Sequence, residues 1–497
     1  MILLRCQKRL AAALYTPSNL ARAVVWLAYW LGVVLAPGAV AQGPLTNGIC
    51  STGVLGPGQQ QQWTLNLDAG DTAVLRVSSE TIFPRWTITG PDGVDRPEQG
   101  GEGVRDQEFF GSFQTGGVYT VTVSNPGPDG PGIYSICLGK GPGPYQTAPG
   151  DEGQLMTSGR LYAASLPVGD VDVWSFQAPA GSFYAVSAGS ATNMIQLSVI
   201  TAGGYSSNTG LSPVFTGGVG DGGLVTVLIS SLGSGGSGAY TINHFVSSGP
   251  IETAGGDEGG KLINGRQTPG RLALGDIDVW DLDVTRGEKV FLRVAAEDIN
   301  NTVINLFDVR GVILQQFFDQ AFGTDIDHSL EIPETGRIRL TLQSVSDGMT
   351  GSYFISSFRT SAPVDSQAEG DGGELTHAVG RDGRLDLGDL DPYFVTLEAG
   401  ERVTVRTVSD EVHPKVTVVS PGGIEIGTDG DGIGRSTVRT FRAPESGTYS
   451  VIIRSFHPAG RGTYTVRYTR LPPDLIVPAG LILPQGNELR AGISAQN

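Results

Sequence analysis

Apolar and polar side chains alternate at a period of two residues along much of the chain, and glycine or proline interrupts the alternation. Side chains two residues apart lie on the same face of a β-strand, so this pattern predicts short antiparallel strands with one buried face. Helical periodicity is hard to find in the sequence. The pattern therefore predicts an all-β protein.

The predicted strands recur in a unit of about 110 residues that is repeated four times. Each unit has an aromatic strand that leads to a glycine, a second strand that starts at a glycine, and a closing Gly-x-Tyr strand. The aromatic strands run over 63–70, 174–181, 280–287 and 393–400. The second strands start at Gly117, Gly223, Gly336 and Gly447, and the closing strands contain Tyr134, Tyr240, Tyr353 and Tyr464.

Stretches rich in glycine and proline separate the units, at 139–150, 247–256 and 361–370. Few contacts are expected to cross linkers of this composition, so we predict modules that fold separately and touch each other sparsely. The predicted organisation is a signal peptide, four antiparallel β-sandwich modules of jelly-roll type, and a tail, over 1–41, 42–141, 145–247, 249–361, 363–471 and 472–497.

The composition agrees with several β-rich domains. A chain of 497 residues exceeds the roughly 250–300 residues at which single cores stop growing. The 73 glycines, 29 prolines and 17% charged residues are typical of short strands joined by many turns. Because 39% of the residues are hydrophobic, the chain can fill cores, which argues against disorder.

The N-terminus has the pattern of an export signal. Four basic residues precede an apolar run over 23–35, and Ala39-Val40-Ala41 forms a small-residue cleavage site. The alternative is an uncleaved anchor, but the run is shorter than the roughly 20 residues that a membrane span needs. We therefore expect a secreted or cell-surface protein with no membrane span after cleavage.

Removal of residues 1–41 would leave 29 basic and 50 acidic residues, a formal charge of −21. Such a chain is a poor partner for nucleic acid, whereas its carboxylates attract divalent cations. The exported chain keeps two cysteines, Cys50 and Cys137, which predicts one disulfide in an oxidising compartment. Two buried thiols are the alternative.

Three units share a Gly-Asp-x-Asp motif before the aromatic residue, over 169–174, 275–280 and 388–393. With the Gly-x-Tyr endings, this motif resembles the bacterial pre-peptidase C-terminal domain family. That family comprises calcium-associated β-sandwiches appended to secreted proteases and also found in tandem, and the resemblance covers residues 45 to 471. Module one departs from it, because Gln59 and Gln61 replace the aspartates. The segment from Asp474 resembles the opening strand of an adhesion-type immunoglobulin-like module.

The second aspartate of each motif shares a strand face with core residues: Asp278 lies on the side of Trp280 and Leu282. An inward carboxylate needs a cation or several donors, and a second acidic group precedes each motif by 18 or 19 residues. The resemblance supports calcium at this position. The candidate calcium ligands are Asp151, Glu152, Asp170, Asp172, Asp257, Glu258, Asp276, Asp278, Asp371, Asp389 and Asp391.

A purely structural role is the competing hypothesis for these aspartates. An arginine precedes the motif in the same three modules, at Arg160, Arg271 and Arg384, and an arginine fork can neutralise a carboxylate without metal. Aspartates also cap turns. The sequence leaves the choice between calcium and these structural roles open.

Catalytic signatures such as H-E-x-x-H, G-x-S-x-G and the phosphate loop are missing from the sequence, and its five histidines are scattered singly. We therefore predict a non-enzymatic extracellular protein whose modules act as a spacer or a binding surface for extracellular matrix or polysaccharide. The alternative is the accessory, non-catalytic part of a secreted hydrolase or peptidase system.

Overall fold

The structure is a computed structural model that describes residues 39–472, apart from short gaps at 94–98, 101–102, 128–129, 233–234, 254–256, 297, 300–301, 320–324, 345–349, 361–363, 365–370, 431 and 458–459. Residues 1–38 of the predicted signal peptide and residues 473–497 of the predicted tail lie outside the described residues. Within the described part, all regular structure is strand and turn, as the alternating pattern predicts.

Module one forms two sheets with the orders β1-β3-β8-β5-β6 and β2-β9-β4-β7. Its strands are β1 (Val40–Pro44), β2 (Ile49–Leu55), β3 (Gln60–Leu67), β4 (Thr72–Ser78), β5 (Arg85–Thr89), β6 (Gln99–Gly100), β7 (Asp106–Ser112), β8 (Gly117–Ser124) and β9 (Gly132–Gly141).

Module two has the sheet orders β11-β16-β13-β14 and β10-β17-β12-β15. Its strands are β10 (Tyr162–Leu166), β11 (Val171–Ala178), β12 (Phe183–Gly189), β13 (Ile195–Thr201), β14 (Gly204–Gly210), β15 (Val214–Gly218), β16 (Gly223–Ser231) and β17 (Gly238–Val246).

Module three has the sheet orders β18-β20-β25-β22-β23 and β19-β26-β21-β24. Its strands are β18 (Gly259–Lys261), β19 (Arg266–Leu272), β20 (Asp278–Val284), β21 (Lys289–Ala296), β22 (Thr302–Phe307), β23 (Ile313–Asp319), β24 (Asp325–Glu331), β25 (Gly336–Ser344) and β26 (Gly351–Arg359).

Module four has the sheet orders β27-β29-β34-β31-β32 and β28-β35-β30-β33. Its strands are β27 (Gly373–Glu374), β28 (Gly380–Leu385), β29 (Asp391–Leu397), β30 (Arg402–Val408), β31 (Pro414–Val419), β32 (Glu425–Asp429), β33 (Ser436–Arg442), β34 (Gly447–Ser455) and β35 (Gly462–Leu471).

The strand order of module two is that of a jelly roll. Numbered from β10, one sheet runs 1-8-3-6 and the other 2-7-4-5, so the first strand lies at the edge of one sheet and pairs there with the last strand. The other modules repeat this order, and modules one, three and four add a parallel edge strand beside the aromatic strand. The fold predicted from the alternating pattern is therefore confirmed, and each module has its own core between its two sheets.

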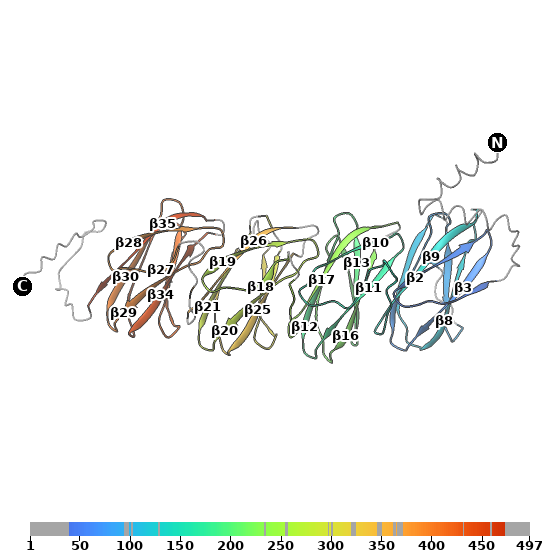
Figure 1. Cartoon of the computed structure of the whole chain (residues 1–497), viewed down its shortest axis with the longest axis horizontal. Helices are drawn as coiled ribbons and strands as arrows, with labels where there is room; N and C mark the ends of the chain where they lie inside the picture. The colour runs from blue at the N-terminus through green and yellow to red at the C-terminus, as the bar shows by residue number, and fades with distance from the viewer. Residues whose placement is uncertain are drawn as a thin grey trace, which may run out of the picture.

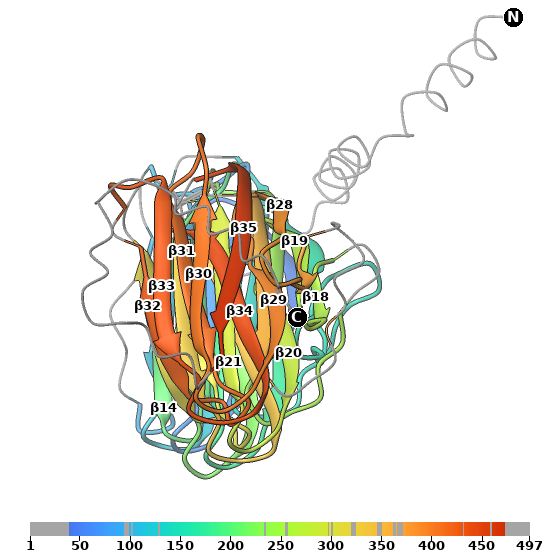
Figure 2. The ribbon, with the colours of Figure 1, turned by 90° about the vertical axis from the view of Figure 1, so that its left-hand side faces the viewer.

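The four modules stack face to face along one axis (Figure 1), and the view down this axis superposes their sheets (Figure 2). At each junction the sheet with the Gly-x-Tyr strand packs on the aromatic-strand sheet of the next module. These junctions contain apolar clusters around Val74 with Val173, Phe245 with Val279, and Phe291 with Leu390. The expectation of sparse contact between modules is therefore wrong, because the outward faces of the internal sheets are apolar and are covered by neighbouring modules.

The predicted disulfide is present between Cys50 on β2 and Cys137 on β9, with their Cα atoms 4.1 Å apart. The two residues are directly opposite each other in the antiparallel register, and they lie on the sheet face that meets module two. Among the described residues, no helix is long and apolar enough to cross a membrane.

Candidate metal centres at the module junctions

The glycine of each Gly-Asp-x-Asp motif lies where one module meets the next. Gly169, Gly275 and Gly388 all have a positive φ, which favours glycine. A Cβ on Gly275 would lie 2.5 Å from the backbone nitrogen of Gly189 in module two, and one on Gly388 would lie 3.0 Å from Ala295 in module three. The motif thus begins with a turn that fits tightly against the preceding module.

The first aspartate of the motif follows this glycine and is buried at the same junction. Asp276 Oδ1 accepts a hydrogen bond from Ile277 N at 2.8 Å and another from Asn243 Nδ2 of module two at 3.0 Å. Its other oxygen accepts from Ala273 N at 3.4 Å. Asp276 therefore caps the turn and joins two modules, which confirms the turn-capping role considered from the sequence.

The second aspartate points into the module core and accepts a hydrogen bond from the closing-strand tyrosine. The Tyr240 hydroxyl donates to Asp172 at 2.5 Å, and Trp174 Nε1 donates to the same hydroxyl oxygen at 2.7 Å. In module three, Trp280, Tyr353 and Asp278 form the same series of hydrogen bonds. In module four, the Tyr464 hydroxyl donates to Asp391. The inward orientation predicted from strand parity is confirmed.

Module one keeps the same network without a carboxylate. Trp63 Nε1 donates to the Tyr134 hydroxyl at 2.7 Å, and that hydroxyl donates to Gln61 Oε1 at 2.8 Å. A neutral amide is therefore a sufficient acceptor for the tyrosine. The carboxylates of the other modules must be explained by something besides this hydrogen bond.

Two groups of three aspartates come together at successive junctions. Carboxylate oxygens of Asp151, Asp170 and Asp172 lie within 4.8 Å of one another, and so do those of the second group, Asp257, Asp276 and Asp278. Asp172 Oδ1 and Asp278 Oδ1 are buried, and no N–H or hydroxyl of the described residues donates to them. Each group therefore holds a buried oxygen atom to which no group of the described residues donates, and which a cation, a proton or a water molecule could satisfy.

Burial and mutual repulsion raise the pKa values of these carboxyls. Desolvation, with the nearby Asp170 charge, raises the pKa of Asp172 to about 9, and desolvation also raises the pKa of Asp170 to about 6. In module three the pKa of Asp278 is raised well above its ordinary value for the same two reasons, and that of Asp257 to about 6. Closely spaced buried carboxylates of this kind gain from a bound cation, which would neutralise their charge.

The first group lies beside an open cavity of about 350 Å³ between modules one and two. Asp151, Glu152 and Asp170 line one part of it, and the disulfide lines another. Cys50 Sγ lies 2.9 Å from Asp170 Oδ1. Because both sulfur atoms are in the disulfide, the ligands available to a metal ion here are carboxylate oxygens.

The remaining candidate ligands lie differently. Glu152 and Glu258 are outside the two groups, although the Asp276 charge contributes to raising the pKa of Glu258, after desolvation. In module four the described aspartates do not form such a group, and Asp371 Oδ2 accepts a hydrogen bond from Arg384 N at 2.8 Å. Of the three modules predicted to hold calcium, two thus bring three carboxylates together.

In modules two and three the described hydrogen bonds and ion pairs of the motif aspartates include no arginine of the Gly-Arg-Leu segments, although the charge of Arg271 acts to lower the pKa of Glu258 in the upstream acidic pair. Arg160 and Arg271 are exposed, and Arg160 lies 3.9 Å from Glu252 rather than beside the motif. Tyrosine, asparagine and backbone N–H groups donate to the aspartates of these motifs instead. These arginines lie at exposed positions of the chain, whereas the motif aspartates are buried, so the two kinds of side chain do not meet.

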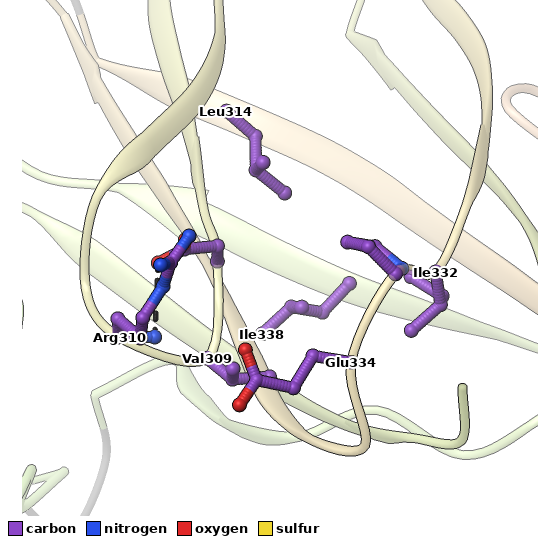
Figure 3. Close-up of a pocket in the computed structure, with 8 residues that line it drawn as sticks. Val309, Arg310, Leu314, Ile332, Glu334 and Ile338 are labelled. Carbon is purple, nitrogen blue, oxygen red and sulfur yellow. Dashed lines mark hydrogen bonds and ion pairs between the residues drawn. The ribbon is translucent and has the colours of Figure 1, made fainter.

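Other chemistry-bearing residues do not extend the site. His244 is buried in the core of module two, where desolvation lowers its pKa to about 3. His413 and His457, which are far apart in sequence, have ring centroids 4.8 Å apart. A hollow in module three holds only about 20 Å³ between Leu314, Ile332 and Ile338 (Figure 3), which is room for about one water molecule.

The sequence contains a signal for the contacts between modules that the alternation of apolar and polar residues alone does not reveal. Val171 and Val173 flank Asp172, so that strand has apolar or buried positions on both faces, which is typical of a strand covered on both sides. The corresponding residues of module one, Gln60 and Gln62, are polar. The tyrosine of Gly-x-Tyr marks the repeat in the sequence, but the repeat does not predict the hydrogen bond from this tyrosine to the aspartate.

No family model and no curated protein matches this chain. Among solved structures, tripeptidyl peptidase 2 is similar at 8% identity over 82% of this chain and 37% of that chain, with a TM-score of 0.16. An archaeal virus turret protein with a triple jelly-roll fold matches at 12% identity over 63% and 82%, with a TM-score of 0.15. The BSP domain of a biofilm-associated protein matches at 9% identity over 87% and 96%, with a TM-score of 0.14. The chain thus spans about a third of the length of tripeptidyl peptidase 2.

Proposed function

We propose that this chain is a non-enzymatic, exported rod of stacked jelly-roll modules that binds calcium at its junctions and contacts extracellular matrix or polysaccharide. We further propose that its modules are divergent members of the pre-peptidase C-terminal domain family, of which the Gly-Asp-x-Asp motif is typical. The observation that carries the proposal is the pair of three-aspartate groups, each with a buried oxygen to which none of the described residues donates a hydrogen bond.

The geometry of each group suits calcium. Calcium binds oxygen atoms at about 2.3–2.6 Å, so ligands on opposite sides of the ion are about 5 Å apart. The oxygen atoms of each group lie within 4.8 Å of one another. Carboxylates, backbone carbonyls and water are the ligands that calcium prefers, and the cavity beside Asp170 leaves space for water.

A cation at these positions would tie three parts of the rod together. The upstream segment supplies Asp151 or Asp257, and the strand edge supplies Asp172 or Asp278. The intervening turn touches the preceding module, as the hydrogen bond from Asn243 to Asp276 shows. Calcium would therefore order the upstream segment and stiffen the junction, which is the property that a spacer needs.

Calorimetric titration of calcium into the chelator-treated full chain tests this proposal. We expect two binding events and a higher melting temperature, because a ligand at a hundredfold excess over its Kd stabilises by about 2.7 kcal/mol. Asp278→Asn should remove one event, whereas Asp283→Asn, at a partly exposed position of the same strand outside the aspartate group, should keep both. The absence of binding heat at millimolar calcium, with an unchanged melting curve, would refute the calcium site.

A further inference from the structure

The two ends of the rod differ from its internal junctions. In module three, Phe291 and Phe358 pair at the centre of the sheet that meets module four. The same register positions in module four hold Thr404 and Thr469, on the outer face of sheet β28-β35-β30-β33. This end of the rod, which faces the viewer in Figure 2, lacks the apolar centre that each internal junction has.

Arginines surround this row of threonines. Arg402 lies directly opposite Arg442, and Arg406 lies directly opposite Arg467, and all four side chains are exposed. Like charges directly opposite each other on a sheet are destabilising. These four arginines give this face a local positive charge in a chain with a formal charge of −17.

The corresponding residues of module three show what these positions do when a partner is present. Lys289, at the position of Arg402, forms an ion pair with Glu425 of module four at 2.5 Å. Arg293, at the position of Arg406, donates to the backbone oxygens of Asp389 and His457 in module four. Basic side chains at these two register positions thus bind oxygen atoms of the module that packs on the sheet.

We propose that this end face binds a linear polysaccharide that carries carboxylate or sulfate groups. Opposite strands place the Cα atoms of two arginines about 5 Å apart, and the two arginine rows along β30 are about 13 Å apart, so a chain of charged sugars can span both rows. Between the rows, Thr404 and Thr440, whose hydroxyl oxygens are 3.0 Å apart, offer hydrogen bonds to sugar hydroxyls. The proposal deepens the polysaccharide part of the proposed function and does not depend on calcium.

A second copy of the chain fits this face less well. The opposite end of the rod presents β3, β5 and β8, and the sequences of these three strands contain no acidic residue that could pair with the arginines. A protein partner would also need an apolar centre, which Thr404 and Thr469 do not supply. The acidic body of the rod repels a polyanion only weakly at the end face, because charges are screened beyond about 8 Å at physiological salt.

Binding of the full chain to polygalacturonate, dextran sulfate and neutral dextran tests the proposal, in chelator so that the calcium sites stay empty. We expect binding to one or both charged polymers that weakens with salt, and none to dextran; the two charged arms show whether carboxylate or sulfate is preferred. Arg402→Gln with Arg406→Gln should weaken binding roughly tenfold or more, without lowering the melting temperature. The matched variant, Arg266→Gln with Arg286→Gln, should bind like the unmodified chain.

Equal binding by the two double variants would overturn the proposal, and so would a failure to bind either charged polymer. Preferential binding to a DNA oligonucleotide, or self-association that the Arg402→Gln and Arg406→Gln changes abolish, would also overturn it by assigning the face to another partner. Because every arm contains chelator, failure of the calcium site leaves the expected polymer binding unchanged, and failure here leaves the calcium titration unchanged.

Discussion

Replacement of Asp172 by asparagine should stabilise the calcium-free protein at neutral pH. Gln61 shows that an amide oxygen can accept the tyrosine hydrogen bond, so Asp172→Asn should keep the bond from Tyr240. The amide nitrogen would take the place of Oδ1, to which no group of the described residues donates. A carboxylate oxygen of Asp172 lies within 4.8 Å of carboxylate oxygens of Asp151 and Asp170. The variant therefore removes an ionisable group and preserves the network.

The magnitude follows from the raised pKa of Asp172. In the folded, metal-free protein this pKa is about 9, against 3.8 for the unfolded chain. Asp172 is then protonated in the folded state and ionised in the unfolded state between these values, so stability is lost as the pH rises from 3.8 to 9. At pH 7 the loss is about 4 kcal/mol, at 1.36 kcal/mol per pKa unit, and asparagine avoids it.

Thermal and denaturant unfolding of the full chain in chelator, from pH 4 to pH 8, measures this difference. The two proteins should be nearly equally stable at pH 4, and Asp172→Asn should become more stable as the pH rises. Asp221→Asn, on an exposed residue of the same module, should follow the unmodified protein. Saturating calcium should reduce or reverse the difference in stability between Asp172→Asn and the unmodified protein, because the ionised carboxylate of the unmodified protein then binds the metal. A stability difference that does not change with pH would refute the reasoning.

Three further predictions follow from the junctions and cores. Gly275→Ala should make modules two and three melt separately, because its Cβ would meet the backbone of Gly189. The control Gly287→Ala is also at positive φ but has open space around it, so it should cost only about 1–2 kcal/mol of strain. Calorimetry can show whether the two modules melt together or apart. Replacement of Cys50 and Cys137 by serine should destabilise module one by about 4–5 kcal/mol in the chain-entropy model, since the bridge closes 87 residues; unfolding at the same midpoint as the oxidised chain would contradict this. Desolvation lowers the pKa of His244 in the folded protein to about 3, so the buried neutral imidazole is fully stabilising above pH 6.5, and this stability is lost as the pH falls from 6.5 toward 3. His244→Phe should therefore make the free energy of unfolding depend less on pH in this range. An unchanged pH dependence below pH 6.5 would exclude His244 as the cause.

The junctions also change what is expected of an isolated module. Residues 249–361 would expose Ile277 and Val279 on one sheet and Phe291 and Phe358 on the other, all of which are buried in the stack. The sequence alone favours independent modules, because few contacts are expected to cross Gly/Pro-rich linkers. We now expect the excised module to associate or to unfold more readily than the same module within the rod, which sedimentation and melting of the fragment can compare with the full chain.

The sequence by itself determined the elements of this protein. Alternation at period two and the repeated Trp and Gly-x-Tyr positions located the strands, since β20, β25 and β26 contain or start at the predicted residues. Strand parity placed Asp278 in the core, and the cysteine count predicted the disulfide. These properties depend on residues that are near in sequence or on simple counting, so local patterns are enough to establish them.

Only the tertiary structure decided what surrounds each strand. The alternation of side chains along the strand predicts that Val279 points away from the module core, but it does not predict that Phe245 of the preceding module packs against it. It likewise could not show that Asp278 meets the Tyr353 hydroxyl, or that Asp257 joins it across about 20 residues while the arginines stay in solvent. Such contacts depend on how sheets stack and how turns fit between modules, and these are long-range packing interactions that no single strand encodes.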